Sequence, residues 1–161
     1  MRTPKTLYPE ERIIYKPELS VCPLCDSELM LCDYLAWDKT VQTLDSVISI
    51  ASRPARCGRP QCQGAQIRLR SAEGEQVAPR GSTYGYDVVA RIGWLRQERR
   101  DTYREIHMEL RDRVQISEAH IRYLYQYVYL PSLACEQRRY VDRLGQAARQ
   151  HGGLIISLDG L

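Results

Sequence analysis

Hydrophobic and polar residues follow two different periods along this chain. Residues 28–37 and 41–51 are rich in Leu, Val, Ile, Tyr and Thr, which predicts two short strands joined at Asp38 and Lys39. From residue 86 onward, apolar residues instead recur every three or four positions, as on one face of a helix. The pattern therefore predicts an α+β chain in which a small β unit precedes a helical unit.

Three helices are expected in the region 86–131. The first is marked by an apolar stripe formed by Val88, Ile92 and Leu95. The second opens with Thr102 and Glu105, whose T-x-x-E spacing is typical of a capping box. After a short turn at 114–116, Ser117 is well placed to cap the third helix.

The third helix contains tyrosines at alternating positions, which is also the period of a strand. They are Tyr123, Tyr125, Tyr127 and Tyr129. The context favours a helix, because Ser117 can cap its start and Pro131 is expected to end it. Some of the rings are expected in the core, since the chain has no Phe, and others could contact sugars or phosphates.

Two short helices joined by a tight turn and preceded by another helix form the pattern of a helix-turn-helix domain. With Ile121, Leu124 and Val128 buried, the outward positions of the third helix are Glu118, Ala119, Arg122, Tyr123 and Gln126. Arg122 could donate two hydrogen bonds to a guanine edge, and Gln126 could pair with adenine. The candidate DNA-binding residues here are Ser117, Arg122, Tyr123 and Gln126. The alternative is an exposed polar face without a function.

Cysteines come in two pairs, with spacings suited to a four-thiolate zinc site: Cys22 and Cys25, then Cys57 and Cys62. The sequence predicts a zinc ribbon, in which the ion supplies much of the stability. The alternative is buried or disulfide-bonded cysteines. Cys32 and Cys135 are expected to be small apolar fillers, although Cys32 could replace Cys62 as a ligand.

The location expected for the chain is the cytoplasm, where thiols stay reduced. The first twenty residues carry acids and prolines and lack the apolar core of a signal peptide. No stretch approaches the ~18 apolar residues of a membrane span. We therefore expect no membrane association.

Net charge is only +3, but the charges are unevenly distributed. Residues 46–72 contain no acid, whereas Arg53, Arg56 and Arg59 lie around the second cysteine pair. Guanidinium groups can fork onto phosphate oxygens, so these arginines are candidate contacts to double-stranded DNA. The alternative is a solvated basic loop that only aids solubility.

A final helix is expected across 132–153, with Val141, Leu144 and Ala148 on one stripe and Gly152-Gly153 as its stop. The following segment, LIISLDGL, reads as a buried strand with Asp159 at its exit. A carboxylate there is well placed to hold a metal. An ordinary Asp-Gly turn is the alternative.

The expected architecture is therefore α+β with several modules. They are an N-terminal tail (1–17), a zinc ribbon (18–70), a linker (71–85), a helix-turn-helix domain (86–131), a connecting helix (132–153) and a terminal strand (154–161).

This order of modules resembles the N-terminal part of insertion-sequence transposases with a DDE catalytic core of the RNase H type. The resemblance implies a protein that binds the ends of its element, associates with the nucleoid and places its first catalytic acid at Asp159. Such cores use three carboxylates to hold two Mg²⁺ or Mn²⁺ ions. The sequence stops two residues after Asp159, so we expect a truncated chain that is inactive alone.

A free-standing zinc-ribbon and helix-turn-helix transcriptional regulator is the alternative function. A complete small enzyme is the least favoured, because His107, His120 and His151 show no nucleophile-base arrangement. The sequence leaves open whether the chain forms a homodimer, and whether the ribbon contacts DNA or protein.

Overall fold

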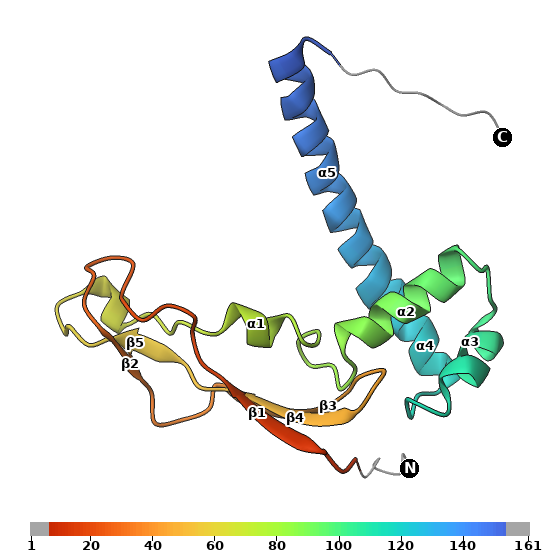
Figure 1. The fold of residues 1–161 in the computed structure, drawn as a ribbon, viewed down its shortest axis with the longest axis horizontal. Coiled ribbons are helices and arrows are strands. Elements are labelled where there is room, and N and C mark those ends of the chain that lie inside the picture. The colour runs from red at the N-terminus through yellow and green to blue at the C-terminus, as the bar shows by residue number, and fades with distance from the viewer. Residues whose placement is uncertain (1–6, 154–161) are drawn as a thin grey trace.

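The computed structural model describes residues 7–153 of the chain. Strands β2 and β5 lie at one end of the molecule and the helices α2, α3 and α4 at the other, with β1, β3 and β4 between them, while α5 projects away (Figure 1). The architecture is α+β, as the sequence predicts, and the main sheet is mixed.

The main sheet has three strands in the order β1-β4-β3. They are β1 (Glu11–Tyr15), β3 (Trp37–Gln42) and β4 (Val47–Ser52). Strands β3 and β4 are antiparallel, and their turn contains Thr43 and Ser46, whose backbones are joined by a 2.9 Å hydrogen bond. The predicted junction at Asp38 and Lys39 is therefore wrong, because both residues pair within β3. The Thr43 hydroxyl closes the actual turn by accepting the Ser46 N–H at 3.0 Å.

Strand β1 comes from the segment expected to be an N-terminal tail. It pairs in parallel with β4. Ile13 and Tyr15 of β1 pack against a small core of Val41, Ile50 and Ala78. The short sequence ERIIY alternates too briefly to stand out as a strand, and it is the pairing with β4 that orders it.

A second sheet carries the cysteine-rich loops. Strands β2 (Leu29–Leu31) and β5 (Ala55–Cys57) pair antiparallel, and the 3-10 helix η1 (Gln63–Ala65) follows. The long strand expected at 28–37 is thus reduced to β2, with the next strand starting at Trp37.

The segment 71–85 is packed onto the sheet and is not an open connection. It contains α1 (Ala72–Glu75), and it buries Ala78 and Tyr84. At Gly74, an added Cβ would lie 2.9 Å from Cβ and Cγ of Tyr15, so α1 approaches β1 more closely than a larger residue allows. Because it lacks an apolar period, the sequence predicts a linker here, but Ala78 joins the core of the sheet and Tyr84 joins the core of the helices.

Glu18 holds α1 in place. Its carboxylate accepts hydrogen bonds from the Ser71 hydroxyl at 2.6 Å and from the N–H groups of Ala72 and Glu73 at 3.1 Å. The Ser71 hydroxyl, followed by these two backbone N–H groups, lowers the pKa of Glu18 from its ordinary 4.5 to about 2.

We expect Glu18→Gln to destabilise the protein in a pH-dependent manner. Because the folded pKa lies below the unfolded one, the stabilisation by Glu18 is fully present above about pH 4.5 and is lost as the pH falls towards 2. Urea unfolding midpoints of the two proteins, measured across this range, should differ above pH 4.5 and converge below it. A difference that stays constant with pH would show that the carboxylate charge plays no part.

Three helices pack around the larger core. They are α2 (Tyr86–Gln97), α3 (Tyr103–Leu110) and α4 (Glu118–Leu124). The core contains every predicted stripe residue of α2, together with Ile106, Leu110, Ile121 and Leu124. Both predicted caps are present, since Thr102 and Glu105 form a capping box and the Ser117 hydroxyl accepts the His120 N–H. The connection between α3 and α4 spans residues 111–117 and is longer than the short turn predicted at 114–116.

A buried glutamine connects the sheet to the helices. The side-chain oxygen of Gln42 accepts the Gln115 N–H at 2.8 Å, and the backbone of Gln42 bonds to Thr83 and Gly85. The Tyr84 hydroxyl donates to the Gln115 carbonyl at 3.0 Å. Gln115 lies in the turn before α4, so these bonds fix the start of α4 against the sheet.

The third helix does not end at Pro131, as the sequence predicted. It continues through a π-helical turn, η2 (Tyr125–Tyr129), into α5 (Leu130–His151). Proline lacks an N–H and normally breaks a helix, but here the Leu130 N–H bonds to the Tyr125 carbonyl five residues earlier. The Ser132 hydroxyl also donates to the Val128 carbonyl at 2.7 Å. Pro131 lies at the start of α5, in the first turn, where a missing N–H is best tolerated, and Gly152 then ends α5 with a φ of 72°.

Candidate metal centre and nucleic-acid interface

The four cysteines predicted as metal ligands come together. Their Sγ atoms all lie within 4.8 Å of one another. The Cys22 and Cys62 sulfur atoms are 3.9 Å apart, and those of Cys25 and Cys57 are 3.5 Å apart. A tetrahedral ion with metal–sulfur bonds of about 2.3 Å requires sulfur atoms about 3.8 Å apart. The spacing therefore fits a tetrahedral metal site and is far longer than a disulfide bond of about 2 Å.

The first cysteine pair lies in a tight turn. The Cys22 carbonyl accepts the N–H groups of Cys25 and Asp26, at 3.4 and 2.9 Å. Asp26 has a φ of 55°, in the left-handed region that Asp tolerates better than most residues. The bridge between Val21 and Glu28 closes the base of this turn, so both sulfur atoms point to the same side.

The second pair is held by strand β5 and by η1. Cys57 ends β5, and its Sγ accepts the Arg59 N–H at 3.4 Å. Cys62 caps η1, and its Sγ accepts the Gly64 N–H at 3.3 Å. A Cβ added at Gly64 would lie only 2.8 Å from the Cys22 sulfur. Glycine at this position lets the two loops approach closely enough to share an ion.

The cysteine side chains differ in acidity. Hydrogen bonds from Ser27 lower the pKa of Cys25 to about 6. The Arg59 N–H also lowers the pKa of Cys57, but burial and the neighbouring sulfur atoms outweigh it and raise that pKa to about 12. Four adjacent thiols resist ionising together because the thiolates repel one another. A bound cation would remove that repulsion and hold all four as thiolates.

The two remaining cysteines lie outside the cluster. Cys32 is buried, as predicted, and Cys62 occupies the ligand position that Cys32 could otherwise have taken. Cys135 is exposed on α5, so its predicted role as an apolar filler is wrong. Within residues 7–153, the four-cysteine cluster is the one group of close His, Cys, Asp or Glu side chains that could hold a metal.

The arginines around the second cysteine pair differ in their surroundings. Arg56 and Arg59 are exposed. Arg53 donates from Nε to the Cys32 carbonyl at 2.7 Å and contacts the Asp33 carboxylate at 3.4 Å. Arg53 therefore helps to position the chain between β4 and β5, which leaves Arg56 and Arg59 as the more available cations.

The predicted outward face of α4 is exposed, while Ile121 and Leu124 are buried. The Arg122 guanidinium lies over the ring of Tyr103, with its Cζ 5.2 Å from the ring centroid, and Arg96 contacts the same ring at the same distance. Gln126 is exposed on η2. Stacking on Tyr103 restricts the Arg122 side chain but leaves the edge of its guanidinium group accessible for hydrogen bonds.

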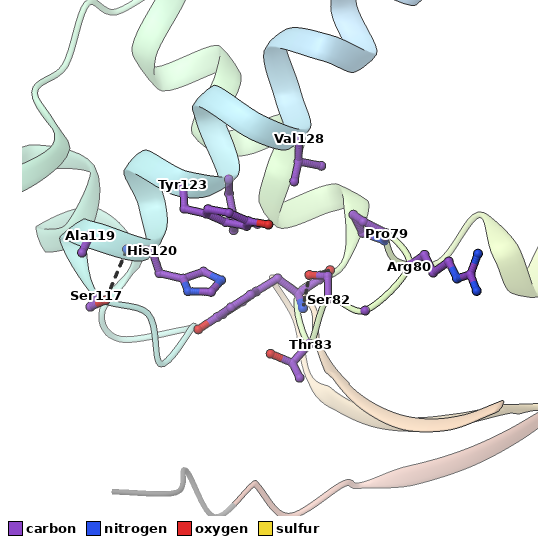
Figure 2. Close-up of a pocket in the computed structure, with 12 residues that line it drawn as sticks. Pro79, Arg80, Ser82, Thr83, Ser117, Ala119, His120, Tyr123 and Val128 are labelled. Atoms are coloured by element: carbon purple, nitrogen blue, oxygen red, sulfur yellow. Dashed lines mark hydrogen bonds between the residues drawn. The ribbon is translucent and has the colours of Figure 1, made fainter. Parts of the chain in front are cut away.

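A groove runs beside this face and was not predicted from the sequence. It has a volume of about 940 Å³ and lies between α4 and the loop 79–83. Figure 2 shows Tyr123 and His120 pointing from α4 towards Ser82 and Thr83, with Ser117 at one end. His120 and Tyr123 form a row of rings with Tyr84 and Tyr127, with centroid separations of 4.9, 5.5 and 5.3 Å along it.

The sequence offered a weak signal for this groove. Arg80 and Ser82 lie in the segment that reads as a linker, and His120 is one turn from Tyr123 and Tyr127 on a helix. That the loop would lie against α4 depends on the Gln42 and Tyr84 contacts, which join residues far apart in the chain.

The two groups of candidate DNA-binding residues lie far apart. Ser117, Arg122, Tyr123 and Gln126 gather on α4 and η2, whereas the three arginines lie around β5, at the opposite end of the molecule (Figure 1). Asp159 and the strand expected at 154–161 lie outside the described residues.

Comparison of the chain with protein-family models, with curated proteins and with solved structures finds no match. Among the helices of residues 7–153, none has the length and apolar character needed to cross a membrane.

Proposed function

We propose that this chain is the DNA-binding part of a transposase, in which a zinc-stabilised β unit is joined to a helix-turn-helix domain. The observation that carries the proposal is the polar, exposed face of α4 on a packed three-helix unit. In helix-turn-helix proteins, the helix in this position enters the major groove and its side chains contact base edges.

Zinc is the metal that best suits the cysteine cluster. Four thiolates in a tetrahedral arrangement favour zinc or an iron–sulfur centre, and structural zinc sites of this kind are closed by four protein ligands. The two cysteine-bearing loops converge on a single point, which fits one ion. We assign the ion a structural role, because all four ligand positions are taken by cysteine.

Base recognition is assigned to Arg122 and Gln126. The Tyr103 ring orients the Arg122 guanidinium, which reduces the entropy lost when it forks onto a guanine. Ser117 and Tyr123 carry hydroxyl groups at the edge of the same face and are suited to phosphate or sugar contacts. Arg56 and Arg59 would hold a second stretch of backbone near the metal centre.

The transposase assignment also implies DNA cleavage and joining, for which the proposed residue, Asp159, lies outside the described residues. By resemblance, Asp159 would supply one carboxylate of a site for Mg²⁺ or Mn²⁺. DNA cleavage and joining would need the further carboxylates of a complete core. We assign only DNA binding to the described residues.

We expect the zinc-loaded protein to select a specific sequence from a pool of random DNA duplexes. On the selected duplex, Arg122→Lys and Gln126→Ala should each weaken binding by about 1–3 kcal/mol, roughly 5- to 150-fold, in fluorescence anisotropy titrations. Arg122→Lys keeps the positive charge, so its affinity for unrelated duplexes should change little. Equal binding of all duplexes by the wild type would overturn the assignment of base recognition.

The same titrations, repeated over a range of salt concentrations, test the phosphate contacts. Removing Arg56 or Arg59 should each reduce the slope of log affinity against log salt by about 0.9. Arg138→Ala, on the exposed surface of α5, serves as a matched control and should leave the slope unchanged. A selected sequence that recurs as an inverted repeat flanking the gene would support a transposase, whereas a promoter sequence would support a transcriptional regulator.

A further inference from the structure

Helix α5 has an apolar stripe that remains exposed, and its main neighbour among the described elements is the adjoining η2. The helix has 22 residues, none of them buried, and it projects from the helical unit (Figure 1). Tyr140 and Val141 are 63% and 65% exposed, and Leu130 and Leu144 are each 37% exposed. An exposed stripe of this kind on a long helix is characteristic of an interaction surface.

The stripe follows a seven-residue repeat. Counting Leu130 as position a, the a and d positions are Leu130, Leu133, Gln137, Tyr140, Leu144, Ala147 and His151. This a/d spacing is the pattern that packs two helices into a coiled coil. A globular core, in contrast, would bury a broader stripe. The repeat spans about three heptads, so the partner that it fits is another helix of similar length.

The flanking residues distinguish the two possible orientations of a pair of α5 helices. In a parallel pair, g residues face e residues of the next heptad, so Glu136 would meet Val141 and Arg143 would meet Ala148. In an antiparallel pair, g faces g and e faces e. Glu136 of each copy would then lie near Arg143 of the second copy, and Val141 near Ala134. The antiparallel arrangement therefore pairs Glu136 with Arg143, and it places the apolar residues Val141 and Ala134 together.

The a and d residues that would face one another in the antiparallel seam also suit each other. Each a position opposes a d position, which sets Leu133 against Leu144, Leu130 against Ala147 and Gln137 against Tyr140 of the second copy. Every one of these contacts occurs twice, because the two-fold axis passes between Gln137 and Tyr140. The Glu136 carboxylate, which contacts Arg139 at 2.7 Å in its own helix, is 67% exposed at its side chain and open to a second cation.

We propose that α5 forms an antiparallel two-stranded coiled coil with α5 of a second copy of this chain. We choose a second copy as the partner because the ion pair between Glu136 and Arg143 would form twice in a two-fold symmetric dimer. The inference does not depend on DNA binding, since the pairing lies on α5 alone. Its consequence for the proposed function is that one dimer carries two α4 helices, which suits DNA with two related half-sites.

Sedimentation of the zinc-loaded chain over a concentration series, without DNA, provides the first test. We expect reversible dimers for the wild type, and monomers for Leu144→Glu, which buries two carboxylates in the seam. Gln146→Glu adds the same charge on the outer surface of α5 and should leave the dimer intact. A wild type that is monomeric at every concentration would overturn the proposal, and would favour another segment or protein as the partner of the stripe.

Charge exchange tests the orientation. Glu136→Arg and Arg143→Glu, each alone, place like charges opposite one another twice and should weaken self-association roughly tenfold. Mixing these two variants should yield a heterodimer, and the double variant E136R/R143E should regain the affinity of the wild type. Arg139→Gln removes the bond within the helix that Glu136→Arg also breaks, and should have little effect. If none of these charge changes alters the affinity of self-association, the antiparallel pairing is excluded.

Discussion

Replacement of Cys57 by serine is expected to abolish metal binding and to unfold the cysteine-rich loops around β2, β5 and η1. Metal binding at a four-thiolate site contributes on the order of 10 kcal/mol, which is comparable to the whole stability of a typical domain. The two-stranded sheet is too small to remain folded without it. Hydrogen exchange of residues 20–66 should therefore accelerate, and the metal content should fall from about one ion per chain to none.

Cys135→Ser provides the matched control, because Cys135 is exposed on α5 and outside the cluster. It should retain the metal and change stability by no more than about 0.5 kcal/mol. Removal of the metal from the wild type with a chelator should reproduce the effect of Cys57→Ser. Full metal content and unchanged exchange in the Cys57 variant would refute the four-cysteine site.

Replacement of Gly93 by alanine is expected to destabilise the helical unit. A Cβ at Gly93 of α2 would overlap the ring of Tyr129. That ring cannot easily move, because it stacks on Tyr125 with an interplanar angle of 16°. Overpacking of this kind costs about 1–3 kcal/mol, which lowers the melting temperature by several degrees in a chain of this size.

Gly145→Ala is the same chemical change in an exposed stretch of α5, where an added Cβ meets only the end of the Arg149 side chain at 3.9 Å. Alanine favours the helix over glycine, so this variant should gain up to about 1 kcal/mol. The two glycine variants should therefore shift the melting temperature in opposite directions. Equal shifts of the melting temperature would show that the close contact between Gly93 of α2 and Tyr129 of η2 leaves room for a methyl group.

The metal centre could be predicted from the sequence because its determinants are local. The first cysteine pair lies in one tight turn with Asp26 in the left-handed region, and the second pair is only five residues apart, at the end of β5 and the start of η1. Only the meeting of the two turns needed the fold, and the pairing of β2 with β5 brings them together. The helix caps at Thr102 and Ser117 were predictable for the same reason, since each involves residues three positions apart.

Three features escaped prediction because each depends on a distant partner. Strand β1 is ordered by β4, whose paired residues lie 37 positions later in the chain. The loop 79–83 is held against α4 through Gln42 and Tyr84. The helix continues beyond Pro131 through a π turn, in which the Leu130 N–H donates to the Tyr125 carbonyl. Residue propensity alone predicts that a proline ends a helix.

The sequence by itself determined the class of the fold, the four clustered cysteines, the helix caps and the buried faces of α2, α3 and α4. These follow from short-range spacing and from the helical period, which any tertiary arrangement must respect. Only the tertiary structure decided which strands pair, that Arg53 supports the β4–β5 connection, and that Arg122 stacks on Tyr103. It also decided that α5 leaves its apolar stripe uncovered, because burial depends on whether another element comes to lie against that stripe.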